Sequence, residues 1–224
     1  MDRSSAVAGG SFASTPQFGK LEIHKVFLSF PNFDLSQKLS PSTLADRSIG
    51  CLSFDFKEVN MKKVGIVMGS DSDLPILRKA MDMLDTLGVP YETHIYSAHR
   101  TPVEARDFAL NARNNGFGCI IAAAGMAAHL AGAIAANTTL PVIGIPCKGG
   151  MMDGLDALLA TVQMPSGIPV ATVAVNGGVN AALLAAQIIA VSEPELAEKL
   201  DAKRASDAAT VLKKDAALQA ELNK

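Results

Sequence analysis

The 224-residue chain contains no tryptophan and two tyrosines, and aromatic residues make up 5% of it. This scarcity weakens the case for a flavin-binding module, because no aromatic sandwich for an isoalloxazine ring is evident. An excess of basic charge is also missing. The formal net charge is −2, so the chain has no electrostatic footprint for nucleic acid or an anionic membrane. No apolar run reaches the roughly 20 residues that span a bilayer. With 49% hydrophobic residues, the composition is typical of a soluble globular protein.

The chain also lacks the residue spacings of metal sites. Its three cysteines and four histidines form no HExxH motif or Cys/His cluster, and no paired carboxylates accompany them. An odd number of cysteines is a poor basis for a disulfide framework. Cys119 and Cys147 lie in apolar runs, unlike Cys51, and are predicted to be reduced core residues, which favours a cytoplasmic location.

Residues 1–60 differ from the rest of the chain, because Ser, Gly and Pro breaks interrupt any period of 2 or 3.6. We interpret them as a disordered, non-catalytic extension or leader, with a targeting peptide as the alternative. Residues 61–224 are the predicted folded domain. We expect a chain starting at Met61 to keep its function and its assembly, the latter measured by light scattering. A lower melting temperature or a smaller assembly would show that residues 21–30 add an edge strand or cover an interface.

From residue 63 onward, short apolar strands alternate with helices. Strands are predicted at residues 64–68, 91–97, 119–124, 141–145 and 169–175. Helices are predicted to begin near residue 73, at a capping box over residues 101–104, and near residues 153, 180 and 194. A further alanine-rich helix after the third strand is predicted to end at about residue 136. Strands this apolar are expected when both sheet faces are covered. The fold class is therefore α/β: a three-layer doubly wound parallel sheet of flavodoxin-like order 2-1-3-4-5. The C-terminal helix is expected to pack on a neighbouring subunit or on the domain's own flank.

Three polar loops follow the first three predicted strands, at residues 69–73, 97–102 and 125–129. In open α/β sheets, ligands bind beyond the carboxyl ends of the strands where the strand order reverses. For the predicted order, that point lies between the first and third strands. We therefore expect the three loops to form one cleft. The glycine pairs 149–150 and 177–178 follow later strands and are expected to let backbone approach the ligand.

The first loop carries two serines and two aspartates. Ser70 and Ser72 can donate to a phosphate at a helix N-terminus, although an ordinary N-cap is the more usual role of such residues. Asp71 and Asp73 would repel a phosphate and are expected to accept hydrogen bonds from sugar hydroxyls. Arg100, in the second loop, would supply the countercharge of the phosphate through its two-donor fork.

Two histidines lie in these loops. His99 is a candidate general acid/base, because imidazole titrates near neutral pH. The alternative is a histidine held by backbone at a strand end. His129 is either a second polar contact or a structural hydrogen-bonding residue. His24 and His94 belong to neither loop.

Together these motifs resemble the N5-carboxyaminoimidazole ribonucleotide mutase family of de novo purine synthesis. The resemblance runs from Met61 to about Leu200, and its landmarks are residues 68–73, 97–102, 127–130, 163–169 and 180–185. It implies a flavodoxin-like fold, a homo-octamer and no metal or organic cofactor. It also implies an ATP-dependent N5-carboxyaminoimidazole ribonucleotide synthase as functional partner, and a cytoplasmic location.

The resemblance further implies an ATP-independent isomerase that interconverts N5-carboxyaminoimidazole ribonucleotide and 4-carboxy-5-aminoimidazole ribonucleotide. His99 would be the catalytic proton carrier, and His129 with its preceding loop would line the carboxylate pocket. The predicted substrate-binding residues are Gly69, Ser70, Ser72, Asp73, Ser97, Ala98, Arg100, Gly125, Met126, Ala127, His129 and Leu130.

Three positions bear on the details of this resemblance. Met126 stands where many members have glycine, and Ala131 stands where many have proline. The related carboxylases that use CO2 directly typically have lysine at the position of Arg100, which favours the mutase. A direct carboxylase is the nearest alternative function, and a flavodoxin-like flavin-binding module is a more distant one.

Overall fold

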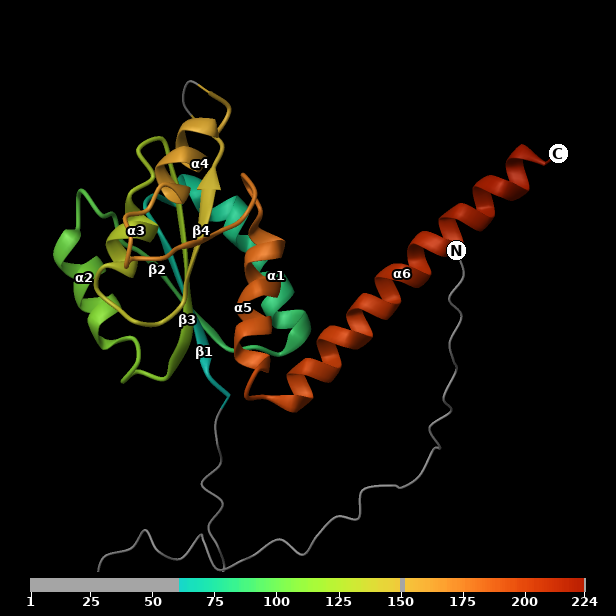
Figure 1. Cartoon of the computed structure of the whole chain (residues 1–224), viewed down its shortest axis with the longest axis horizontal. Helices are drawn as coiled ribbons and strands as arrows, with labels where there is room; N and C mark the ends of the chain where they lie inside the picture. The colour runs from blue at the N-terminus through green and yellow to red at the C-terminus, as the bar shows by residue number, and fades with distance from the viewer. Residues whose placement is uncertain (1–60, 150–151, 224) are drawn as a thin grey trace, which may run out of the picture. The chain divides into compact units, whose positions relative to one another are not determined.

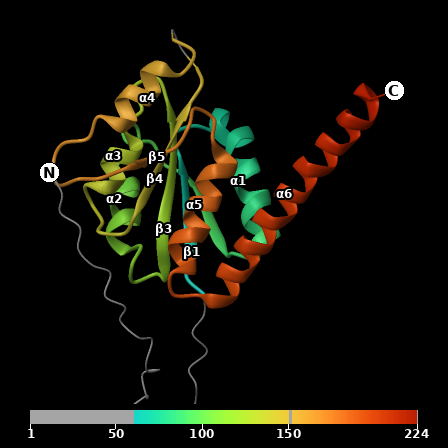
Figure 2. The ribbon, with the colours of Figure 1, turned by 45° about the vertical axis from the view of Figure 1, so that its right-hand side comes forward.

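The computed structural model describes residues 61–149 and 152–223. Its centre is a parallel five-stranded sheet in the order β2-β1-β3-β4-β5 (Figures 1 and 2). The strands are β1 (Lys63–Met68), β2 (Tyr91–Ile95), β3 (Phe117–Gly125), β4 (Val142–Cys147) and β5 (Ala171–Thr172). The predicted sheet and strand order are confirmed, so the switch point lies between β1 and β3. The predicted extension 1–60, with His24 and Cys51, lies outside the described residues.

Helices cover both faces of the sheet (Figure 2). They are α1 (Leu74–Leu87), α2 (Pro102–Asn111), α3 (Leu130–Ala135), α4 (Leu155–Val162), α5 (Gly178–Ala190) and α6 (Pro194–Leu222). Alternate strand residues face opposite sides. Ile66 and Ile121 pack with α1 and α5, whereas Val67 and Ile120 pack with α2 and α3. Burial on both sides explains why the central strands are apolar without alternation.

Gly178 allows a close contact between α1 and α5. A Cβ atom at this position would collide with the carbonyl oxygen of Ile76 on α1. Neither Gly177 nor Gly178 lines the cavity at the carboxyl edge of the sheet. The prediction that this glycine pair approaches a ligand was therefore wrong, because the missing side chain serves helix packing instead.

The fifth strand is much shorter than the predicted range 169–175. Only Ala171 and Thr172 form ladder pairs with β4. The chain beyond them runs beside β4 with isolated contacts, such as the Asn176 amide donating to the Pro146 carbonyl at 2.9 Å. The apolar pattern reflected proximity to the sheet rather than continuous pairing, and an edge strand has only one neighbour to pair with.

The two halves of α6 have different surroundings. Leu196 and Leu200 are buried against the domain, and Lys199 Nζ donates to the Leu87 carbonyl at the end of α1 over 3.0 Å. Val211 and Leu222, in the second half, are exposed, and this half extends away from the sheet (Figure 1). The expected packing on the domain's own flank is therefore confirmed for the first turns. In the described ranges, no helix combines the length and the apolarity needed to cross a membrane.

A small charge cluster joins Lys63 of β1 to Glu92 and His94 of β2, and we expect it to make stability depend on pH. Glu92 accepts from Lys63 Nζ at 2.6 Å and contacts His94 Nε2 at 2.8 Å. The hydrogen bond from Lys63 is the largest cause lowering the Glu92 pKa below its ordinary value, followed by the bond from His94. A carboxylate whose pKa is lower in the folded state stabilises the fold above its unfolded pKa. This contribution is lost as the pH falls through the folded value.

We expect the substitution Glu92→Gln to weaken the acid dependence of the unfolding free energy, with an effect of about 1 kcal/mol or less because the pair is half-exposed. Chemical denaturation between pH 3 and 7 measures it. Glu198→Gln, an exposed carboxylate on α6, serves as the matched control. An equal change in both variants would show that the Lys63 contact contributes nothing.

Candidate active site

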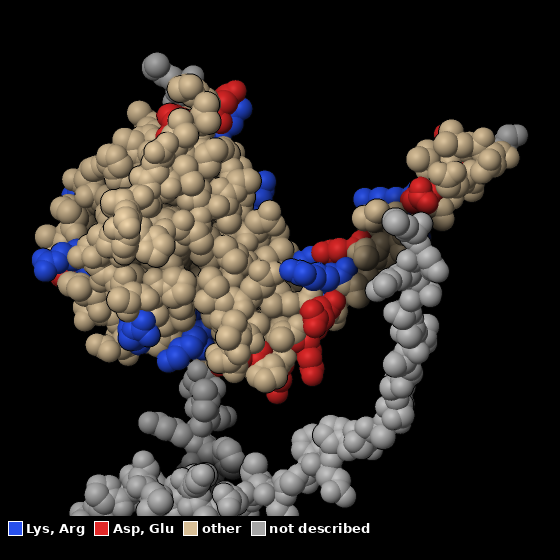
Figure 3. Space-filling view, viewed as in Figure 1, with Lys and Arg blue, Asp and Glu red and all other residues tan. Residues whose placement is uncertain are grey.

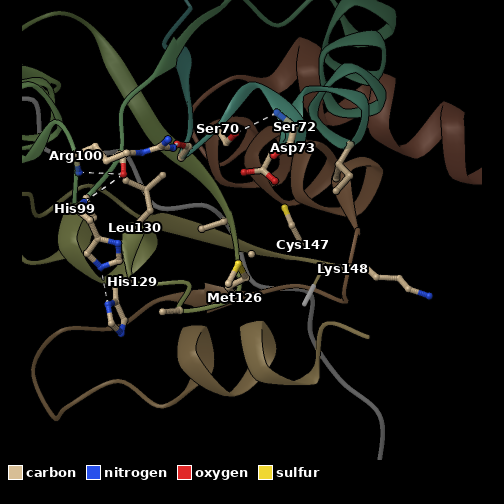
Figure 4. A pocket seen from close by; sticks show the side chains of 18 residues that line it. Ser70, Ser72, Asp73, His99, Arg100, Met126, His129, Leu130, Cys147 and Lys148 are labelled. Carbon is tan, nitrogen blue, oxygen red and sulfur yellow. Dashed lines mark hydrogen bonds between the residues drawn. The ribbon is translucent and has the colours of Figure 1, made fainter. Parts of the chain in front are cut away.

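A cavity of about 640 Å³ opens at the carboxyl edge of the sheet. Its size is typical of small-molecule sites. The loops after β1, β2 and β3 surround it, and His99 and all the predicted substrate-binding residues line it (Figure 4). Asp71, which was also expected to accept hydrogen bonds from sugar hydroxyls, does not line it. Gly149 of the predicted 149–150 pair lines it as well, whereas Gly150 lies outside the described residues. The convergence of the three loops is therefore observed, while the role of each residue stays a prediction.

The loop after β1 forms a 3₁₀ turn, Asp71–Asp73, that leads into α1. Ser70 is its N-cap: its Oγ accepts from the Ser72 amide at 3.3 Å and lies 3.1 Å from Asp71 Oδ1. The N-cap interpretation of Ser70 is thus confirmed. Asp73 is 9% exposed and lines the cavity. Burial raises the pKa of its carboxyl group, while hydrogen bonds from Cys147 and from the Ser70 backbone oppose this rise.

The loop after β2 is held by side chains from within the loop. The Ser97 amide donates to Thr101 Oγ1 at 2.8 Å, and Ser97 Oγ accepts from the His99 and Arg100 amides at 3.3 and 3.2 Å. Thr101 therefore makes no side-chain cap for α2, and the predicted capping box was wrong. Its hydroxyl stabilises the tight turn that presents His99 and Arg100 to the cavity.

Arg100 connects the second loop to the first. Its Nη2 donates to the Gly69 carbonyl oxygen at 2.6 Å. This bond uses one nitrogen of the guanidinium and leaves its other N–H groups available for an anion, because arginine carries five donors in a planar fork. The contact fixes the distance between the loops after β1 and β2.

The two loop histidines are hydrogen-bonded to each other. His99 Nε2 lies 2.9 Å from His129 Nδ1, and the rings meet edge to face at 79°. One nitrogen must donate and the other must accept, so the pair holds a proton between the rings. Figure 4 shows this pair on one side of the cavity and Asp73 on the other. His99 is thus not a strand-end histidine held by backbone, and His129 is its polar partner.

The chain has clear relatives among known proteins. A family model described as AIR carboxylase matches residues 63–210. The chain belongs to the AIR carboxylase family. An N5-carboxyaminoimidazole ribonucleotide mutase of Pyrococcus horikoshii is 58% identical over 137 residues, which are 61% of this chain and 77% of that relative. A phosphoribosylaminoimidazole carboxylase of Candida albicans is 57% identical over 126 residues, 56% of this chain but 22% of that relative. The crystal structure of Treponema denticola PurE superposes with a TM-score of 0.62 at 29% identity, covering 68% of this chain and 96% of that one.

Met126 has a backbone conformation that suits glycine better than a residue with a side chain. Its φ angle is 54°, in the left-handed region that costs a side-chain-bearing residue about 1–2 kcal/mol. The side chain is 66% exposed and lies at the cavity. This member of the family therefore carries local strain in the loop after β3.

We expect Met126→Gly to raise the free energy of unfolding by up to about 1 kcal/mol. Glycine relieves the backbone strain, and this gain is larger than the free-energy cost of the extra conformational entropy that glycine gives the unfolded chain. Met126→Ala keeps a Cβ and should leave the free energy nearly unchanged. Urea denaturation of the three proteins measures both effects. Equal stability of the glycine and alanine variants would show that the positive φ carries no cost.

Sequence reasoning missed several residues around the cavity. Ile76, Ala124, Cys147 and Lys148 also line it, and Asn176 holds the loop after β4 by accepting from the Lys148 amide at 2.8 Å. Ile76 lies on a predicted helix, and Cys147 lies in the apolar run of β4. For both residues, the sequence therefore indicated a place in the core rather than in the cavity lining. The position of Lys148 directly after a strand was the available signal. Within residues 61–149 and 152–223, no group of three or more His, Cys, Asp or Glu side chains is arranged to hold a metal ion.

Proposed function

We propose that this protein interconverts N5-carboxyaminoimidazole ribonucleotide and 4-carboxy-5-aminoimidazole ribonucleotide in de novo purine biosynthesis. The observation that carries this proposal is the single cavity lined by the His99–His129 pair, Arg100 and Asp73 in a chain of the AIR carboxylase family. It is an isomerase that moves a carboxylate within one molecule and requires no ATP.

The polar groups of the cavity match the parts of a ribonucleotide. Arg100 binds the phosphate with the N–H groups that Gly69 leaves available. Asp73 accepts from the ribose hydroxyls, and its ionised form is the better acceptor. The aminoimidazole then lies toward His99 and His129, on the opposite side of the cavity (Figure 4).

The reaction breaks one bond and forms another without net gain or loss of atoms. The N5–carboxylate bond breaks to release CO2, and N5 takes up a proton. Carbon C4 of the ring then attacks the CO2, and the C4 proton leaves. His99 carries the proton between N5 and C4, and its hydrogen bond to His129 fixes the orientation of the imidazole.

Holding CO2 beside C4 is the main contribution of the cavity. Capture of dilute CO2 is a bimolecular step, and good positioning of the reactants supplies about 7–11 kcal/mol of such a barrier. Exclusion of water keeps the CO2 from escaping or being hydrated. A cavity of about 640 Å³ is large enough to hold a mononucleotide.

A direct carboxylase is the second candidate, because the Candida albicans relative carries that name. Two points favour the mutase. The aligned region is 22% of that carboxylase but 77% of the Pyrococcus horikoshii mutase. The resemblance also favours the mutase, because Arg100 stands where direct carboxylases typically have lysine.

The test is conversion of synthetic N5-carboxyaminoimidazole ribonucleotide by the purified chain, without ATP or bicarbonate. We expect turnover under these conditions, and no acceleration by bicarbonate. Turnover only of aminoimidazole ribonucleotide with added bicarbonate would identify the direct carboxylase instead. A colourless protein excludes bound flavin.

The proposed enzyme assembles as a homo-octamer. Leu155, Leu159 and Val162 form a half-exposed apolar stripe along α4, which a single subunit leaves in water. The face seen in Figure 3 carries few charged side chains, and these lie at its margin and along α6. Light scattering should give eight times the chain mass of 23.3 kDa. The ATP-dependent synthase that makes the carbamate is the functional partner, and both act in the cytoplasm.

A further inference from the structure

Met126 places an exposed thioether at the active-site cavity. Its side chain is 66% exposed and lines the cavity, and Figure 4 shows it between the His99–His129 pair and Asp73. Its φ angle of 54° is strained for a residue that carries a Cβ atom. Such strain is concentrated at functional sites, where the surrounding structure maintains it. The strained position therefore indicates that the side chain itself has a role in the cavity.

The Met126 sulfur is the sulfur that a small oxidant meets in this cavity. Cys147 also lines the cavity, but it is 1% exposed, and burial raises its pKa to about 12. A thiol with this pKa stays protonated near neutral pH, whereas the thiolate is the form that reacts. A thioether carries no proton, so its oxidation to the sulfoxide depends on access and not on a pKa.

The route to Met126 stays open when subunits assemble. A ribonucleotide must enter the cavity that Met126 lines, and hydrogen peroxide is far smaller than a nucleotide. Met152 is the other exposed methionine within the described residues, at 53%, and it lies outside this cavity. The two side chains therefore have similar exposure, and they differ in whether a bound ligand can cover them.

We propose that Met126 is a reversible oxidation site, at which hydrogen peroxide forms the sulfoxide and thereby weakens ribonucleotide binding. This inference rests on the proposed function for its ligand. The thioether sulfur attacks one oxygen of the peroxide, so that an S–O bond forms and the O–O bond breaks. The proton of the transferred oxygen passes to the departing hydroxide, which leaves as water. The sulfur loses two electrons, and the peroxide gains them.

The sulfoxide changes the chemistry of the cavity, because it replaces a flexible apolar group by a polar and chiral one. A bound ribonucleotide then buries the polar S–O group. We expect the cost of this burial to lower the affinity by about five- to thirtyfold. Methionine sulfoxide reductases regenerate the thioether, so the loss should be reversible.

The experiment treats the full-length parent, Met126→Leu and Met152→Leu with hydrogen peroxide. Peptide mass spectrometry locates the sulfoxides, and calorimetry with 4-carboxy-5-aminoimidazole ribonucleotide compares each protein with its own unoxidised form. We expect both methionines of the parent to be oxidised, and the ribonucleotide to slow oxidation of Met126 but not of Met152. Affinity should fall in the oxidised parent and in oxidised Met152→Leu, and methionine sulfoxide reductases should restore it. Oxidised Met126→Leu should keep its own starting affinity.

A Met126 thioether that survives while Met152 is oxidised would overturn the inference. Undiminished affinity of the oxidised parent, or an equal loss in oxidised Met126→Leu, would overturn it as well. A parent that binds no ribonucleotide before oxidation would instead contradict the proposed function. The two failures are distinguishable, because peptide mapping of the oxidation needs neither binding nor turnover.

Discussion

Replacing His99 with asparagine is expected to lower turnover by about 10²- to 10⁴-fold while leaving the fold and ribonucleotide affinity nearly intact. Asparagine has a similar size and retains hydrogen-bonding groups, so it can still contact His129. It cannot take up and release a proton near neutral pH. Steady-state turnover of the carbamate and calorimetric binding of the product measure the two quantities separately.

The matched control for this prediction is His94→Asn. His94 lies on β2, bonded to Glu92 and outside the cavity, so the same chemical change should leave turnover unaltered. His129→Asn is expected to cause a smaller loss than His99→Asn, because it removes the partner and not the proton carrier. Turnover of the His99 variant within a few-fold of the parent would remove His99 from the mechanism.

Replacing Arg100 with lysine is expected to weaken ribonucleotide binding by about 10- to 100-fold, the range of one or two lost charge-assisted hydrogen bonds. The guanidinium donates to the Gly69 carbonyl and retains donors for the phosphate. A single ammonium group cannot hold both partners in the same geometry. Calorimetry with the product ribonucleotide and with the corresponding nucleoside measures the phosphate-dependent part of the loss.

The comparison of the two ligands decides this prediction. The loss should shrink for the nucleoside, which lacks the phosphate. An equal loss for both ligands would place Arg100 in a purely structural role between the loops. Arg113→Lys provides the control, because Arg113 donates to Thr139 and does not line the active-site cavity.

The sheet and its functional edge were predictable from sequence, because the signals were local. Apolar strands without alternation indicated a doubly covered parallel sheet, and Gly88 ends α1 in a left-handed conformation, a common way for a helix to stop. Once the strand order was inferred, topology alone brought His99, Arg100 and His129 to one edge.

Features that depend on contacts across the sheet were not predictable. The sequence places Cys147 in an apolar run, and only the alignment of β4 with the loop after β1 reveals that it lines the same cavity as Asp73. The Thr101 side chain had two possible partners, and the backbone of the folded loop selects Ser97. The short β5 has the same cause, since pairing depends on the path of a distant chain segment.

The topology also bears on how this domain can evolve. β1 begins, and α6 departs, at the edge of the sheet opposite the cavity, since α5 runs back across the sheet before α6 starts (Figure 1). Polypeptide joined before Lys63 therefore enters the domain at the edge away from the substrate loops. Gene fusion at this end can lengthen the protein without rebuilding its chemistry. In the Candida albicans relative, the region that aligns with this chain is 22% of the length, so similar sequence does occur within a much longer chain.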